Sequence, residues 1–122
     1  MNRRVLLADQ HDHALWALRT ALREEAGLTV VGEASHAASL VSQAQILCPD
    51  LILLEWELPG LPPAELLSIL CALDPRPQLV VLSQQSESGL EKVVLASGAD
   101  TFVSKAKEPG ELLTVLRGLV RP

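Results

Sequence analysis

Short apolar runs alternate along the chain with longer segments in which apolar residues recur at helical spacing. The short runs lie at residues 5–8, 28–31, 51–54, 79–82 and 101–103. Runs with so little polar interruption are typical of strands that are buried on both faces, as in a parallel sheet. The pattern therefore predicts five interior strands.

A helix is expected after each strand, and most of these helices carry signals at their ends. Ser35 is a candidate N-cap, Gly27 is a candidate C-cap, and residues 88–91 form a Ser-x-x-Glu capping box. Pro63 and Pro109 suit the first turns of the third and fifth helices. The expected helices span residues 13–26, 36–47, 63–73, 88–98 and 109 onward.

A strand followed by a helix, repeated along the whole chain, indicates one fold class. Parallel strands joined by helices need right-handed crossovers, which produce an α/β doubly wound, three-layer sandwich. This number of units fits the flavodoxin-like (βα)5 fold, a five-stranded parallel sheet with strand order 2-1-3-4-5, whereas a barrel needs about eight. The 122 residues suit a single domain over 1–122, in which 118–122 are either the start of a linker or a terminus.

Composition excludes several classes of protein for this domain. Apolar residues make up 48% of the chain and aromatic ones 2%, so the core must be aliphatic. The net charge of −5 leaves no basic stripe for duplex DNA, and no run approaches the ~20 apolar residues that span a bilayer. No secretory signal is visible, and Cys48 and Cys71 are too few for a disulfide framework. We expect a cytoplasmic protein with two free thiols and no membrane partner.

Polar residues follow the predicted strands at the places where ligands bind in folds of this kind. In an open α/β sheet, ligands occupy the crevice beyond the carboxyl ends of the strands. An amine beside carboxylates and a hydroxyl fits an ion or phosphate site there, and it fits a salt-bridged polar plug equally well. The residues concerned are Asp9, Gln10, Glu55, Trp56, Glu57, Ser83, Gln84 and Lys105.

A different candidate for a metal site is the run His11-Asp12-His13. Histidines two residues apart do not share one face of a helix, so this run is a poor metal site. No nucleotide loop is present, because the glycines match neither a P-loop nor a Gly-x-Gly-x-x-Gly pattern.

Four segments, taken in order and at compatible spacing, resemble a known family. They are RVLLADQH at 4–11, DLILLEWELPG at 50–60, VVLS at 80–83 and GADTFVSK at 98–105. They resemble, respectively, a first strand with its acidic pair, a phospho-acceptor strand, a strand ending in a switch hydroxyl, and a segment with a switch aromatic and a lysine. The chain therefore resembles the receiver domain of bacterial two-component response regulators. Residues 30–34 and 105–112 look most like receivers joined to helix-turn-helix DNA-binding domains.

The receiver-like chain differs from the family at the positions that carry the phosphorylation chemistry. The resemblance puts Glu55 at the phospho-acceptor position, where the family has aspartate. It puts Asp9 and Gln10 where the family has two acids, the second of which usually binds magnesium directly. Gln84 stands at the pocket entrance, where the family usually has a small residue. The resemblance therefore implies a degenerate receiver.

Other positions of the pocket keep the residue types of the family. Ser83 matches the switch hydroxyl, Phe102 the switch aromatic and Lys105 the invariant lysine. Glu57 adds an acid to the pocket, and Trp56 either covers its entrance or faces a partner. In a receiver without a moving switch, we expect Phe102 to be packed.

The departures weaken the usual chemistry for physical reasons. Phosphoryl transfer to a carboxylate needs in-line positioning and a divalent ion, and Mg²⁺ prefers hard oxygen ligands. Gln10 supplies no charge for that ion, and the extra methylene of Glu55 displaces its carboxylate by about 1 Å, which can cost about 100-fold. We expect no cofactor and weak or absent Mg²⁺, for which Asp9 and Glu55 are the remaining weak ligands. The charge of Glu55, directed toward Ser83 and Lys105, imitates part of an acyl phosphate.

Three functions remain open on the sequence. The first is an interaction module, not an enzyme, that serves two-component signalling or transcription regulation through protein contacts. The second is a working receiver with residual Mg²⁺-dependent phosphorylation. The third is a small-molecule sensor at the sheet crevice, by analogy with flavin-binding relatives of the fold. In a purely structural alternative, Glu55 pairs with Lys105 and only stabilises the edge of the sheet.

Contacts with protein partners are the expected output of the first function. Receivers commonly pair through the last two helices with the fifth strand, or through the face of the first and last helices, and we expect a symmetric homodimer. Leu90, Val93, Val94 and Leu95 nearly encircle the helix at 88–98, so at least one should be exposed. DNA would be bound only through a C-terminal domain outside this chain.

Overall fold

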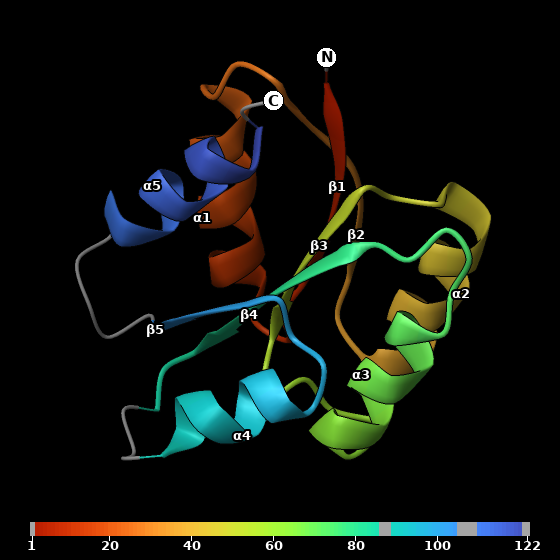
Figure 1. Cartoon of the computed structure of the whole chain (residues 1–122). Helices are drawn as coiled ribbons and strands as arrows, with labels where there is room; N and C mark the ends of the chain where they lie inside the picture. Colours follow the sequence, from red (N-terminus) through yellow and green to blue (C-terminus); the bar gives the residue numbers. More distant parts are fainter. Residues whose placement is uncertain (1, 86–88, 105–109, 121–122) are drawn as a thin grey trace.

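Strands and helices alternate in the computed structural model, which describes residues 2–85, 89–104 and 110–120 (Figure 1). The strands are β1 (Arg3–Ala8), β2 (Leu28–Ala34), β3 (Leu51–Glu55), β4 (Gln78–Ser83) and β5 (Thr101–Ser104). The helices are α1 (Asp12–Arg23), α2 (Ala37–Leu47), α3 (Pro63–Cys71), α4 (Leu90–Ala96) and α5 (Gly110–Val120). The predicted order of elements is confirmed.

The strands form one parallel sheet in the order β2-β1-β3-β4-β5. A helix lies between each pair of consecutive strands, because parallel neighbours cannot be joined by a tight turn. β3 is at the centre of the sheet, and all of its residues are buried. This is the predicted flavodoxin-like arrangement.

The helices cover both faces of the sheet and give the molecule three layers (Figure 1). α1 and α5 lie on one face, and α2, α3 and α4 lie on the other. Alternate residues of β3 supply the two interiors: Leu51 and Leu53 pack on the α1–α5 side, and Ile52 and Leu54 on the α2–α4 side. The buried apolar side chains of the described residues are all aliphatic, as the scarcity of aromatic residues requires.

Two helix caps differ from the prediction. The N-cap of α2 is His36 rather than Ser35, and its Nδ1 accepts a hydrogen bond from the Ser39 amide at 3.3 Å. An imidazole nitrogen can replace a serine hydroxyl here because the cap needs only an acceptor. The C-cap of α1 is Glu24 rather than Gly27, whose φ of 87° instead turns the chain into β2.

β2 continues to Ala34, beyond the predicted residues 28–31. The strand extends because Gly32, Glu33 and Ala34 pair with β1. The charged Glu33 is tolerated since β2 is an edge strand, where Arg19 Nη1 contacts the Glu33 carboxylate at 2.6 Å. The edge position therefore explains why an apolar run alone underestimates this strand.

The third and fourth helices are shorter than predicted. α3 ends at Cys71, with Ala72 as its C-cap, and α4 begins after Gly89, its N-cap. Ser88, which was expected to begin the capping box, and Pro109, which was expected to open α5, lie outside the described residues.

The predicted excess of apolar surface on α4 is confirmed. Val94 is fully buried, whereas Val93 and Leu95 are 54% and 42% exposed. Within the described part of the chain, none of the helices combines the length and the apolar character that crossing a bilayer requires.

Candidate functional site

Buried polar side chains gather at the carboxyl ends of three neighbouring strands. Among the described residues, the buried polar or charged side chains are Asp9, Glu55 and Ser83. Asp9 follows β1, Glu55 ends β3 and Ser83 ends β4, and these strands are adjacent in the sheet. Each is the first polar residue after a buried apolar run, so the parallel sheet brings all three to one edge.

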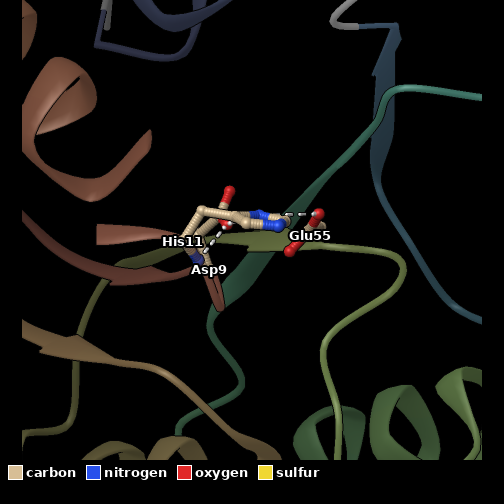
Figure 2. A group of neighbouring side chains, drawn as sticks. All are labelled: Asp9, His11 and Glu55. Atoms are coloured by element: carbon tan, nitrogen blue, oxygen red, sulfur yellow. Dashed lines mark hydrogen bonds and ion pairs between the residues drawn. The ribbon is translucent and has the colours of Figure 1, made fainter. Parts of the chain in front are cut away.

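The imidazole of His11 lies against both buried carboxylates (Figure 2). Its Nδ1 is 3.2 Å from Asp9 Oδ1 and 3.8 Å from Glu55 Oε1. The His11 amide also donates a hydrogen bond to Asp9 Oδ1 at 2.9 Å, a turn in which an aspartate binds the backbone two residues on. The His11 side chain remains 57% exposed, so the cluster faces solvent on the histidine side and protein on the carboxylate side.

A second set of hydrogen bonds joins the loops after β1, β3 and β4. The Ser83 hydroxyl donates to Glu57 Oε1 at 2.5 Å and accepts from the Gln85 amide at 3.0 Å. Gln10 Nε2 donates to the Glu57 carbonyl oxygen at 3.2 Å, and the Gln10 amide donates to Glu55 Oε2 at 3.4 Å. We call the group formed by Asp9, Gln10, His11, Glu55, Glu57 and Ser83 the carboxyl rim.

The hydroxyl of Ser83, toward which the charge of Glu55 was expected to be directed, donates its hydrogen bond to Glu57. The Trp56 amide donates to the Leu82 carbonyl at 2.7 Å and so extends the pairing of β3 with β4 beyond the end of β3. Because of this extension, the following residue, Glu57, lies beside Ser83. The hydroxyl of the switch position is therefore satisfied by a neighbouring carboxylate.

The remaining predicted site residues differ in how far their side chains are buried. Trp56 and Phe102 are half-buried and pack against the interior beneath α2, α3 and α4, which agrees with a packed Phe102. Gln84 is exposed directly after β4. Lys105 lies outside the described residues, so its expected ion pair with the buried carboxylates stays a prediction.

A cluster in the rim has the side chains to hold a metal ion. Asp9, His11 and Glu55 each offer one ligand atom, and these atoms all lie within 4.8 Å of one another. In the sequence His11 belongs to the run His11-Asp12-His13, but His13 is exposed and is not part of the cluster. The signal for His11 was its position two residues after Asp9 at the start of a helix, from which its side chain can turn back toward the strand end.

Comparison with known proteins identifies the family of this chain. The response regulator receiver domain model matches residues 5–117. The chain is similar to the nitrate/nitrite response regulator protein NarL of Escherichia coli K12, with 33% identity over 112 residues, 92% of this chain and 52% of NarL. It is also similar to the transcriptional regulatory protein LiaR of Bacillus subtilis, with 28% identity over 114 residues, 93% of this chain and 54% of LiaR. The chain thus spans about half the length of these curated relatives.

Solved structures show the same fold. The isolated receiver domain of RcsB from Salmonella enterica serovar Typhimurium matches with a TM-score of 0.91 at 23% identity, covering 98% of this chain and 88% of that one. The response regulator domain of CheB from Thermotoga maritima matches with a TM-score of 0.85 at 25% identity, covering 100% of both chains. The sheet order, the family match and the relatives agree with the motif-based prediction, and the chain belongs to the response regulator receiver domain family.

Proposed function

We propose that this receiver acts through protein contacts and is not phosphorylated in the usual aspartate- and Mg²⁺-dependent way. The observation that carries the proposal is Glu55, a buried glutamate at the end of β3, where the resemblance puts the aspartate acceptor of the family. A receiver without a phosphorylation switch must signal through standing contacts, with no enzymatic activity of its own.

The surroundings of the Glu55 carboxylate support the proposal. The Gln10 amide donates to Oε2 at 3.4 Å, and the His11 imidazole lies 3.8 Å from Oε1, so both oxygens face neighbouring groups. An acceptor must present an oxygen in line with the phosphorus atom, and a displacement of about 1 Å, the length that one methylene adds, can cost about 100-fold. Glu55 is therefore a poor phosphoryl acceptor in this position.

The side chains of the rim also fit Mg²⁺ poorly. Mg²⁺ requires near-octahedral oxygen ligation, mainly by carboxylates and waters. Gln10 carries no charge, and its Nε2 is bonded to the Glu57 carbonyl oxygen. The imidazole nitrogen of His11 lies against the carboxylate of Asp9. These residues do not fit the ion that the family implies, so we propose that Mg²⁺ binding is weak or absent.

The intact mass of the protein tests this function. The protein is incubated with Mg²⁺ and acetyl phosphate, and a second sample is titrated with Mg²⁺ and beryllofluoride while the fluorescence of Trp56 is followed. Trp16 is 60% exposed, so a Trp16→Phe background isolates the Trp56 signal. We expect no phosphoryl mass gain and no saturable fluorescence change. A stoichiometric gain of one phosphoryl group, or a saturable Mg²⁺-dependent change, would contradict the proposal and favour a working receiver.

Exposed apolar side chains on α4 support a contact surface. Val93 and Leu95 are exposed, and Leu113 on α5 is half-buried. We propose a symmetric homodimer through α4, β5 and α5, with the α1–α5 face as the alternative. A specific dimer should bury at least about 1,000 Å² in total.

Sedimentation of the parent protein and of a Val93→Glu variant tests the dimer. A charge on this exposed side chain should convert a dimer into a monomer without disturbing the core. Val94→Glu is unsuitable because Val94 is fully buried. A parent protein that sediments as a monomer at tens of micromolar would remove the homodimer and leave a contact with a different protein.

The longer relatives support a role in transcription. RcsB from Salmonella enterica serovar Typhimurium has been solved bound to the promoter rprA. We propose that this receiver, in the cytoplasm, belongs to a longer regulator that binds DNA through a C-terminal domain. The coding sequence downstream of residue 122 tests this directly, since a helix-turn-helix domain should follow in frame.

A further inference from the structure

We infer that the carboxyl rim is a site for a divalent transition metal ion of the Zn²⁺ class, with Asp9, His11 and Glu55 as ligands. The inference concerns the kind of ion, because the rim fits the Mg²⁺ of the family poorly. It rests on the proposed function in that both give this edge of the sheet a chemistry other than Mg²⁺-dependent phosphorylation.

The ligand atoms are already near the spacing of a tetrahedral site. With metal–ligand distances of about 2.0–2.2 Å, two ligand atoms of a tetrahedral zinc ion lie about 3.3–3.6 Å apart. His11 Nδ1 lies 3.2 Å from Asp9 Oδ1 and 3.8 Å from Glu55 Oε1. All three candidate ligand atoms lie within 4.8 Å of one another. The two distances from His11 Nδ1 therefore bracket the spacing of a tetrahedral site.

The types of donor atom select the metal. Imidazole nitrogen combined with carboxylate oxygen suits Zn²⁺, Ni²⁺ and Cu²⁺, whereas Mg²⁺ and Ca²⁺ prefer oxygen ligands alone. Three protein ligands leave a fourth position for water or another small ligand. The exposed side of His11 gives an ion access to the cluster from solvent.

Backbone contacts hold the ligands in place before an ion binds. The His11 amide donates to Asp9 Oδ1 at 2.9 Å and fixes the turn that carries the imidazole. The Gln10 amide lies 3.4 Å from Glu55 Oε2, on the oxygen that does not face the imidazole. Contacts of this kind around the ligands orient them and raise the affinity for a metal.

A further buried oxygen adds negative charge to the rim. Glu57 Oε2 is buried and has no hydrogen-bond partner in the part of the chain that the structure describes, while Oε1 is bonded by Ser83. Gln10 links Glu57 to the cluster, because its side chain reaches the Glu57 carbonyl and its amide reaches Glu55. A buried carboxylate oxygen without a donor is costly, and a divalent cation on the same rim would offset part of that cost.

Parallel calorimetric titrations of the metal-free chain with Zn²⁺ and with Mg²⁺ test the inference. We expect one Zn²⁺ per chain, bound at least about 100-fold more tightly than Mg²⁺, since one ligand is an imidazole. His11→Ala should lower the Zn²⁺ affinity at least about 10-fold. Because the His11 side chain is exposed, the variant should keep the parent fold, which circular dichroism checks. His13→Ala removes an exposed histidine outside the cluster and is the matched control, with unchanged affinity.

Co²⁺ serves as a spectroscopic probe of the same site. A visible Co²⁺ spectrum without a thiolate charge-transfer band places the ion on nitrogen and oxygen ligands, whereas such a band would place it on Cys48 or Cys71 and overturn the inference. A shift of the His11 imidazole resonances on addition of Zn²⁺ gives a second readout that does not depend on stability.

Besides a thiolate charge-transfer band, three results would overturn the inference: no Zn²⁺ binding, equal affinities for Zn²⁺ and Mg²⁺, or an unchanged Zn²⁺ affinity in His11→Ala. None of them produces a phosphoryl mass gain, so the proposed function would survive them. A protein that is phosphorylated and still binds Zn²⁺ through His11 would instead overturn the proposed function alone.

Discussion

The two ends of the sheet use charged side chains in opposite ways. At the amino end, the Arg4 guanidinium donates to the Leu47 carbonyl at 2.5 Å and to the Cys48 carbonyl at 3.1 Å, while the Arg4 amide donates to Asp50 at 2.8 Å. Asp100 works in the same way, because its Oδ2 accepts from the Leu79 amide. Each charge there satisfies backbone groups where a strand begins or where a helix ends.

At the carboxyl end, groups of like charge lie together instead. The carboxylates of Asp9 and Glu55 are buried on one rim, and Glu57 adds a third. Taking carboxylates out of water beside one another costs free energy. The charges at the amino end of the sheet therefore stabilise the fold. The cluster of carboxylates at the carboxyl end is not required for stability.

The largest effect is expected at the amino end, from Asp100→Ala. Asp100 Oδ2 accepts hydrogen bonds from the buried Leu79 amide at 2.8 Å and from Arg76 Nη1 at 3.0 Å. Its loss should lower the free energy of unfolding by about 2–3 kcal/mol, because a buried donor and a charged partner lose their acceptor. Urea unfolding measures this, and Asp100→Asn, which keeps an acceptor, is the control. An unchanged urea midpoint for Asp100→Ala would contradict a stabilising role for the charges at the amino end of the sheet.

A loss of similar or smaller size is expected at the carboxyl end from Lys105→Ala. We propose that the ammonium group of Lys105 pairs with Glu55 or Asp9, which follow neighbouring strands. Removing that charge should destabilise the protein by about 1–3 kcal/mol through the carboxylates that it leaves behind. Lys92, which is exposed on α4, provides the control in a Lys92→Ala variant. Equal unfolding midpoints for the two variants would contradict the pairing.

Glu55→Gln should have a smaller effect, with the opposite sign to that of Asp100→Ala. Removing one charge from a rim with three carboxylates should change the free energy of unfolding by no more than about 1 kcal/mol, and toward greater stability. Chemical denaturation of the parent and the variant measures the difference. A destabilisation as large as that of Asp100→Ala would show that the carboxyl rim is as structural as the amino end.

The smallest effect is expected from the ion pair of the half-buried Glu25 with the exposed Arg117, near the start of β2. Arg117 Nη2 donates to Glu25 Oε1 at 2.7 Å, and this hydrogen bond lowers the pKa of Glu25 below its ordinary value of 4.5. A lowered pKa means that the pair stabilises the folded protein above pH 4.5, and that this contribution is lost as the pH falls through the lowered pKa. Melting temperatures of the parent and Glu25→Gln should differ at neutral pH and converge in acid. A constant difference would contradict this assignment.

The apolar pattern predicted the fold because burial on both sides of a parallel sheet leaves a strong signal in each strand. Leu51 to Leu54 is such a run, and it forms the central strand. The signal fails at the edge, where Gly32 and Glu33 extend β2 through backbone pairing that the side chains do not reveal. Element order was therefore predictable, and element length was less so.

The site was predictable only as far as strand order could place it. Asp9, Glu55 and Ser83 come directly after or at the end of apolar runs, so topology alone brings them together. The contact of the His11 imidazole with Asp9 depends on the turn in which the His11 amide binds the Asp9 carboxylate. The hydrogen bond from Ser83 to Glu57 depends on a local extension of the pairing between β3 and β4. Both contacts depend on local geometry on the scale of a few ångströms, which the spacing of residues along the sequence does not determine.

The most direct test of the proposed function compares the parent protein with a variant that restores the family pattern, Gln10→Asp combined with Glu55→Asp. Both proteins are incubated with Mg²⁺ and acetyl phosphate, and their intact masses are measured. We expect the variant to gain one phosphoryl group and the parent to gain none, because positions 10 and 55 decide the chemistry of the rim. A phosphoryl group on the parent, or an unmodified variant that is correctly folded, would contradict it.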